Sequence, residues 1–104
     1  MTTGMIHTVY FWLTPGLSVE QRDNFVAATK GLIAAPTVQQ CLVGSPAATP
    51  TREVTDNTFD YCLQLHFASV ADHDAYQVSE VHVRYVEEQA AKFATVKVYD
   101  TELI

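Results

Sequence analysis

Charged residues are scarce in this chain of 104 residues, since only 17% of its side chains are Asp, Glu, Lys or Arg, against about 25% in a typical globular protein. Basic residues are the scarcer kind: 6 Lys and Arg stand against 12 Asp and Glu, so the formal net charge is −6. Nucleic acids and anionic membranes bind clustered Lys and Arg, so we expect neither as a partner. Because a small domain has a large surface to solvate, the shortage of charge indicates that part of this surface is covered.

Cysteines and long apolar runs are also few. Cys41 and Cys62 show neither Cys-x-x-Cys spacing nor a nearby His at metal-ligand intervals, so we interpret them as reduced, partly buried thiols, with a disulfide or a catalytic thiolate as alternatives. No apolar run approaches the roughly 18 residues that a membrane helix needs. Residues 1–4 lack the basic start and cleavage site of a signal peptide. We therefore expect a cytoplasmic protein.

Hydrophobic residues make up 48% of the chain, which excludes wholesale disorder. The length supports one domain, residues 1–104, built around a single core. Residues 1–19 and 31–51 carry no formal charge, and residues 57–71 carry only Asp60. The stretches without formal charge coincide with strand-like segments, and the charged stretches coincide with helix-like segments.

The first uncharged stretch predicts a strand over residues 5–13 whose two faces are both covered. His7 and Phe11 would lie on one face, and Tyr10 and Trp12 on the other, so neither face is a normal solvent face. The patterns and turn residues downstream predict six more elements: a helix from Ser18 to Pro36, a strand over 37–43, a strand over 58–67, helices over 69–77 and 79–92, and a strand over 95–100. Residues 45–57 form a turn-rich loop between the second and third strands.

This order predicts an α+β fold of the ferredoxin-like βαββαβ type, with a four-stranded antiparallel sheet, helices on one face and the second helix split in two. The other face would expose an apolar and aromatic patch larger than soluble monomers usually tolerate. We therefore expect a homodimer that packs sheet on sheet through Tyr10, Trp12 and His66.

The sequence resembles the stress-responsive A/B-barrel (Dabb) family over essentially its whole length. The strand at residues 5–13 before Pro15-Gly16 is similar to the family's H-x-V-x-F-x-L start. Phe67-Ala68-Ser69, Ala75-Tyr76 and the His82–Tyr85 pair resemble its F-x-S, A-Y and H-x-x-F patterns. The resemblance implies a ferredoxin-like fold paired into a dimeric α/β barrel.

The resemblance also implies candidate site residues. In a plant member that closes a polyketide ring, a pocket between sheet and helices uses three histidines and a tyrosine, and His7, Tyr76 and His82 correspond to three of these positions. Tyr61 stands where that member has its third histidine. Residues that could line the same pocket are Tyr61, Phe11, Leu63 and Tyr85.

The residue types themselves are suited to acid–base chemistry. An imidazole can abstract a proton next to a carbonyl while a tyrosine hydroxyl polarises the carbonyl oxygen. Buried histidines are also common as purely structural residues, and that alternative stays open for His7 and His82. No carboxylate or cysteine accompanies these two at ligand spacing, so we expect no metal and no cofactor. His73, beside Asp72 and Asp74, is expected at the surface.

Three functions remain possible at this point. The preferred one is a small dimeric protein that binds a small hydrophobic or aromatic ligand in a pocket between sheet and helices. The alternative is a cofactor-free enzyme, similar to a polyketide cyclase, isomerase or oxygenase, that uses His82 and His7 as acid and base with Tyr76. The third is a structural or interaction module with a filled interior.

Overall fold

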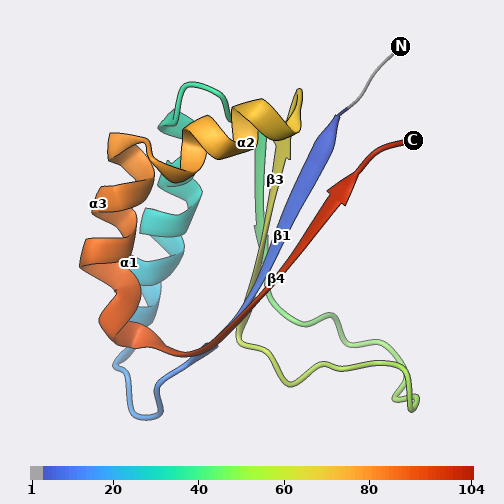
Figure 1. The fold of residues 1–104 in the computed structure, drawn as a ribbon. Coiled ribbons are helices and arrows are strands. Elements are labelled where there is room, and N and C mark those ends of the chain that lie inside the picture. Colours follow the sequence, from blue (N-terminus) through green and yellow to red (C-terminus); the bar gives the residue numbers. More distant parts are fainter. Residues whose placement is uncertain (1–3) are drawn as a thin grey trace.

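The computed structural model describes residues 4–104. It has a four-stranded antiparallel sheet with helices on one face (Figure 1). Residues 1–3 lie outside this range, and with them most of the segment that is expected to lack the features of a signal peptide. Along the chain, the elements are β1 (Met5–Leu13), α1 (Val19–Lys30), the 3-10 helix η1 (Gly31–Ala34), β2 (Gln40–Gly44), β3 (Tyr61–Phe67), α2 (Val70–Gln77), α3 (Glu80–Gln89), the 3-10 helix η2 (Ala90–Lys92) and β4 (Phe93–Glu102).

This order confirms the predicted ferredoxin-like fold with its divided second helix. The strand order is β2-β3-β1-β4, so β1 is paired antiparallel on both edges. In this register His7 lies opposite Leu65 of β3 and opposite Asp100 of β4. Within the described residues, no helix has the length and apolarity needed to cross a membrane.

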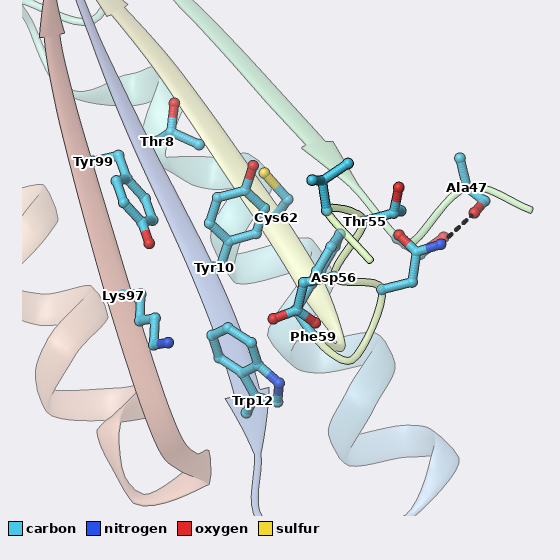
Figure 2. A pocket seen from close by; sticks show the side chains of 13 residues that line it. Thr8, Tyr10, Trp12, Ala47, Thr55, Asp56, Phe59, Cys62, Lys97 and Tyr99 are labelled. Carbon is cyan, nitrogen blue, oxygen red and sulfur yellow. Dashed lines mark hydrogen bonds between the residues drawn. The ribbon is translucent and has the colours of Figure 1, made fainter. Parts of the chain in front are cut away.

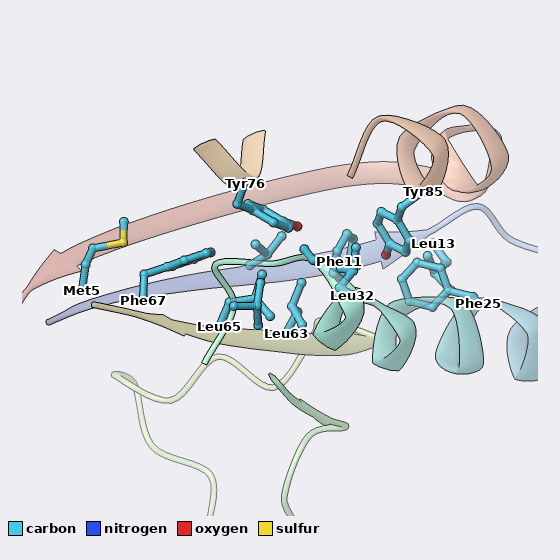
Figure 3. Packing of buried hydrophobic residues seen from close by; sticks show 13 residues of the cluster. Met5, Phe11, Leu13, Phe25, Leu32, Leu63, Leu65, Phe67, Tyr76 and Tyr85 are labelled. Carbon is cyan, nitrogen blue, oxygen red and sulfur yellow. The ribbon is translucent and has the colours of Figure 1, made fainter. Parts of the chain in front are cut away.

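The core lies between the sheet and the three α-helices (Figure 3). Burial alternates along β1, because every second side chain faces the helices and is buried while its neighbours are only half-buried. Phe25 of α1 and Leu65 of β3 are both fully buried where these two layers meet. The helices do not cover β4, since all of residues 94–102 are exposed.

Serine caps begin each α-helix at the predicted residue. The Ser18 hydroxyl accepts a hydrogen bond from the Gln21 amide at 3.1 Å, and the Gln21 side chain accepts one from the Ser18 amide at 2.8 Å. The Ser69 and Ser79 hydroxyls cap α2 and α3 by one bond each, accepted from the Asp72 amide and the His82 amide. The cap at Ser79 places His82 in the first turn of α3, next to the core.

Several predicted boundaries were wrong by a few residues. The helix expected over 18–36 ends at Lys30 and continues as η1, and the strand expected over 37–43 begins at Gln40. The strand expected over 95–100 extends over 93–102, because it pairs with β1 along nearly its full length. The strand expected over 58–67 begins only at Tyr61.

A bend at Asp60 shortens β3 and reverses the expected side of Phe59. The Asp60 carboxylate accepts a hydrogen bond from the Leu13 amide at 2.7 Å, and the Asp60 amide donates to the Phe11 carbonyl at 2.8 Å. The alternation of side chains between the two sheet faces, predicted over the whole strand 58–67, therefore stops at Asp60. An unbroken strand over 58–67 would place Phe59 beside Tyr61 on the helix-facing side, but the Phe59 ring centroid lies 4.9 Å from that of Tyr10 on the helix-free face.

Candidate functional site

The three residues expected to carry acid–base chemistry lie next to one another on the helix-facing side of the sheet. His7 projects from β1, Tyr76 from the last turn of α2 and His82 from the first turn of α3. The ring centroids of His7 and Tyr76 are 6.1 Å apart, and those of Tyr76 and His82 are 4.7 Å apart. The fold thus brings together residues that are distant in sequence, while their catalytic role stays a prediction.

Burial limits the chemistry that His7, Tyr76 and His82, a row of mutually tilted rings called the stack below, can perform. Only 5% of His7 and 2% of Tyr76 is exposed, and burial raises the pKa of the Tyr76 hydroxyl well above the ordinary tyrosine value. His82 is half-buried, and its Nδ1 lies 2.9 Å from the Gln77 carbonyl oxygen. A carbonyl oxygen only accepts hydrogen bonds, so Nδ1 of His82 carries the proton and Nε2 is the ring nitrogen that can accept another.

Asp100 of β4 is the hydrogen-bond partner of His7. Its Oδ1 lies 2.5 Å from His7 Nδ1, and its side chain is 43% exposed whereas that of His7 is buried. Burial lowers the pKa of His7, and the hydrogen bond and negative charge of Asp100 partly offset this effect. Asp100 was not among the predicted site residues. The alternation of Val96 and Val98 in β4 is the sequence signal that could have placed it on the helix-facing side.

His73 was expected at the surface, and this was wrong. Only 13% of its side chain is exposed, and its ring centroid lies 4.9 Å from that of His7. The ring also meets the edge of Phe67 at 5.6 Å between centroids, because α2 lies over this end of the sheet. The Nδ1 atom of His73 lies 3.0 Å from a carboxylate oxygen of Asp74. A pocket of about 270 Å³ opens beside His73 and Asp100.

These contacts remove the reason for which no metal site was expected. A carboxylate appeared to be missing beside His7, yet β4 supplies Asp100, and α2 supplies His73 as a second imidazole. One ligand atom from each of the three residues lies within 4.8 Å of the other two. Two imidazoles and a carboxylate are a set of donors that can hold a divalent metal ion.

The four residues expected to line a pocket between sheet and helices are packed in or against the core. Phe11 and Leu63 are almost fully buried. The Tyr85 hydroxyl lies 2.8 Å from the Thr29 hydroxyl inside the core, and Tyr61 packs against its edge. None of the four lines the pocket beside His73 or the larger pocket on the helix-free face of the sheet.

A pocket of about 780 Å³ lies on the opposite, helix-free face of the sheet (Figure 2). Its floor includes Tyr10 and Trp12 of β1, two of the residues predicted for the dimer interface. Phe59 and Tyr99 add aromatic walls, with the Tyr99 ring centroid 6.1 Å from that of Tyr10. The loop at residues 45–59 forms another side and projects away from the helices (Figure 1).

Polar groups are placed at one end of this pocket. The Lys97 ammonium lies 5.5 Å from the ring centroid of Trp12, within reach of a cation–π interaction. The Trp12 indole N–H donates a hydrogen bond to the Thr58 hydroxyl at 3.0 Å. Asp56 accepts hydrogen bonds from the hydroxyl and amide of Thr58, and these lower the pKa of the Asp56 carboxyl. His66, the third predicted interface residue, is half-buried on the same sheet face.

The profile of the Stress responsive A/B Barrel Domain, Dabb, matches residues 5–103. The match covers nearly the whole chain, as the resemblance in the strand and helix motifs implied. No curated protein matches the sequence.

Solved structures share the fold at low sequence identity. A hydroxynitrile lyase from Passiflora edulis superposes with a TM-score of 0.83 at 20% identity, over 100% of this chain and 96% of that one. A dimeric ferredoxin-like protein from Thermobifida fusca gives a TM-score of 0.79 at 16% identity, with 99% and 93% covered. A Dabb family protein from Mesorhizobium loti also gives 0.79, at 18% identity with 98% of each chain covered. At these identities the likeness shows the fold alone.

The raised pKa of the buried Tyr85 hydroxyl predicts that the protein loses stability at alkaline pH. Burial raises its pKa to about 12, whereas the pKa of a tyrosine in the unfolded chain is about 10. Between these values the unfolded chain has lost the proton and the folded protein retains it, so the free energy of unfolding falls as pH rises, by about 1.4 kcal/mol per pH unit for such a group. In Tyr85→Phe this contribution is absent, so the variant loses less stability between about pH 10 and 12.

Urea denaturation of wild type and Tyr85→Phe over this pH range measures the difference. Equal pH dependence in wild type and Tyr85→Phe would contradict the raised pKa.

Proposed function

The chain belongs to the stress-responsive A/B-barrel (Dabb) family, and on this premise we propose that it is a homodimer that binds a small hydrophobic or aromatic molecule in the pocket on its helix-free face. The observation that carries the proposal is an aromatic pocket of about 780 Å³ on a sheet face that no helix covers. Cys41 and Cys62 are free thiols, which is compatible with the reducing cytoplasm, where we propose that the protein acts.

Exposed apolar surface supports the dimer. On the helix-free side, Tyr99 is 58% exposed and Leu42 is 47% exposed, and they flank the half-buried row that contains Tyr10 and Trp12. Contiguous apolar patches of this kind usually mark interaction sites. A two-fold pairing presents the same patch from both chains, so one apolar surface covers another. Similar structures from other organisms are described as dimeric, which agrees with this pairing.

The size and lining of the pocket support a small aromatic ligand. Binding sites for small molecules commonly enclose about 300–1,000 Å³ and combine apolar walls with a few polar groups, as this pocket does. Tyr10, Phe59 and Tyr99 offer ring faces and edges for stacking. Lys97 and Asp56 add one positive and one negative charge to the lining, so the pocket can pair with a charged or polar group of the ligand. The pocket is open to solvent in a single chain, and a second copy over the same face would close it.

The location differs from the pocket expected between sheet and helices. That region is occupied by Phe11, Leu63 and Tyr76, which are each at most 3% exposed. A ligand could enter there only after these core side chains had moved, whereas the helix-free pocket already offers room.

A second candidate function, cofactor-free acid–base catalysis, is favoured by the stack of His7, Tyr76 and His82. It ranks second because so little of His7 and Tyr76 is exposed to a substrate. A hydroxynitrile lyase shares the fold, so mandelonitrile is a reasonable probe. If the stack is catalytic, wild type releases benzaldehyde and cyanide from mandelonitrile and His82→Ala is slower by about 100-fold or more. Absence of turnover by the wild type, or equal turnover by a folded His82→Ala variant, would contradict this use of the stack.

Trp12→Glu is expected to separate the dimer. An unpaired carboxylate in an apolar interface costs several kcal/mol, and each 1.4 kcal/mol weakens association about tenfold. Size-exclusion chromatography with light scattering should therefore show wild type as a dimer and Trp12→Glu as a monomer or aggregate. Val19→Glu, at a position of α1 that is 75% exposed, is the matched control and stays dimeric. A folded Trp12→Glu variant that remains dimeric would contradict this interface.

Trp12 is the only tryptophan of the chain and lines the proposed pocket, so its fluorescence reports on ligand binding. We expect saturable quenching of Trp12 by 1-anilinonaphthalene-8-sulfonate, whose rings suit the aromatic walls and whose sulfonate can pair with Lys97. Removing one aromatic wall, in Tyr99→Ala, should weaken binding by about two- to tenfold, the loss expected for an aromatic contact of about 0.5–1.5 kcal/mol.

The matched control is Tyr61→Ala, which removes the same side chain on the helix-facing side and should bind the dye as wild type does. Equal weakening in both variants, or no saturable quenching of wild type, would contradict the pocket.

A further inference from the structure

We propose that His7, His73 and Asp100 bind one divalent transition-metal ion, of the kind that Zn²⁺ represents. The proposal is independent of the aromatic pocket, because these residues lie on the helix-facing side of the sheet. They come from β1, α2 and β4, so the fold alone brings them together. One ligand atom from each lies within 4.8 Å of the others.

The donors match the chemistry of such an ion. Two neutral imidazoles with one carboxylate are a common protein set for Zn²⁺ and Fe²⁺, and they leave further coordination positions open. Metal–ligand bonds of about 2.0–2.2 Å place neighbouring ligand atoms about 3–3.5 Å apart. The widest separation in the cluster therefore has to shrink by about 1–2 Å, which rotation of the half-exposed Asp100 and of His73 can supply.

Binding replaces two existing contacts. His7 Nδ1 and Asp100 Oδ1 are 2.5 Å apart, so these two atoms have to move about 0.5–1 Å further apart for an ion to replace the proton between them. His73 Nδ1 lies 3.0 Å from a carboxylate oxygen of Asp74. His73 Nε2 has only a longer contact, 3.3 Å to the Gln77 amide nitrogen, so Nε2 is the nitrogen that can bind the ion in place of this contact. A carboxylate that accepts from the remaining ring N–H, as Asp74 does, is the usual support for a metal-bound histidine.

The surroundings favour a cation. The pocket of about 270 Å³ beside the cluster is lined by the carboxylates of Asp74, Asp100 and Glu102, and neither lysine nor arginine contributes to its lining among the described residues. These negative charges attract a cation to the open side of the cluster. On the closed side, the Phe67 ring contacts both imidazoles edge-on, at 6.5 Å from His7 and 5.6 Å from His73 between centroids. The two imidazoles thus lie against an apolar ring, and the pocket gives solvent access to His73 and Asp100.

Metal titration of the untagged, chelator-treated protein tests this site. We expect isothermal titration with Zn²⁺ to show one ion bound per chain, and Co²⁺ to give the visible absorption of a nitrogen- and oxygen-ligated ion. His73→Ala and Asp100→Asn should each weaken Zn²⁺ binding by more than about tenfold. Neither change removes a large core side chain, so circular dichroism should show the wild-type fold.

His66→Ala is the matched control, because it removes a histidine from the opposite face of the sheet and should leave the affinity unchanged. Absence of stoichiometric binding by wild type would overturn the proposal. Binding that survives in both His73→Ala and Asp100→Asn, or that His66→Ala weakens equally, would overturn it as well. Dye binding at the helix-free pocket does not involve these residues, so failure here leaves the proposed function standing.

Discussion

The structure depends on one constraint: β1 is paired on both edges and carries no formal charge on either face. One row of its side chains must be covered by helices, and α1, α2 and α3 provide that cover. The other row, with Tyr10 and Trp12, needs a cover that a single chain does not supply. Both the packed core and the proposed pairing of two chains follow from this requirement.

The two faces of the sheet have different chemistry as a result. The helix-facing side is tightly packed, and its polar residues His7, His73 and Asp100 meet near β4, where the helical cover ends. The helix-free side has a broad aromatic pocket, one side of which is a loop that extends beyond the sheet. We therefore propose ligand binding at one face and metal binding at the other. The two assignments can be tested separately, because no residue lines both sites.

The fold could be predicted because its signals are local. The period of two in β1 and the serines at 18, 69 and 79 each determine an element without reference to distant residues. The start of β3 could not be predicted in this way. It depends on Asp60, whose carboxylate and amide bind the backbone of β1, and alternation alone does not reveal a contact between segments so far apart.

The site could be predicted only in part, for the same reason. His7, Tyr76 and His82 were selected through the family resemblance, and the fold does bring them together. Asp100 could not be assigned to His7 without the register of β4 against β1, and the position of His73 depends on how α2 lies over the sheet. The aromatic pocket was missed because Phe59 changes sides at the bend and the preceding loop has no periodic pattern.

The central claim is that a second copy of the chain covers the helix-free face. Sedimentation equilibrium of the wild-type protein over a wide concentration range tests this most directly, because it measures mass in solution without altering any residue. The account predicts the mass of two chains, with the mass of one chain appearing only on strong dilution. The mass of a single chain at every concentration would contradict it.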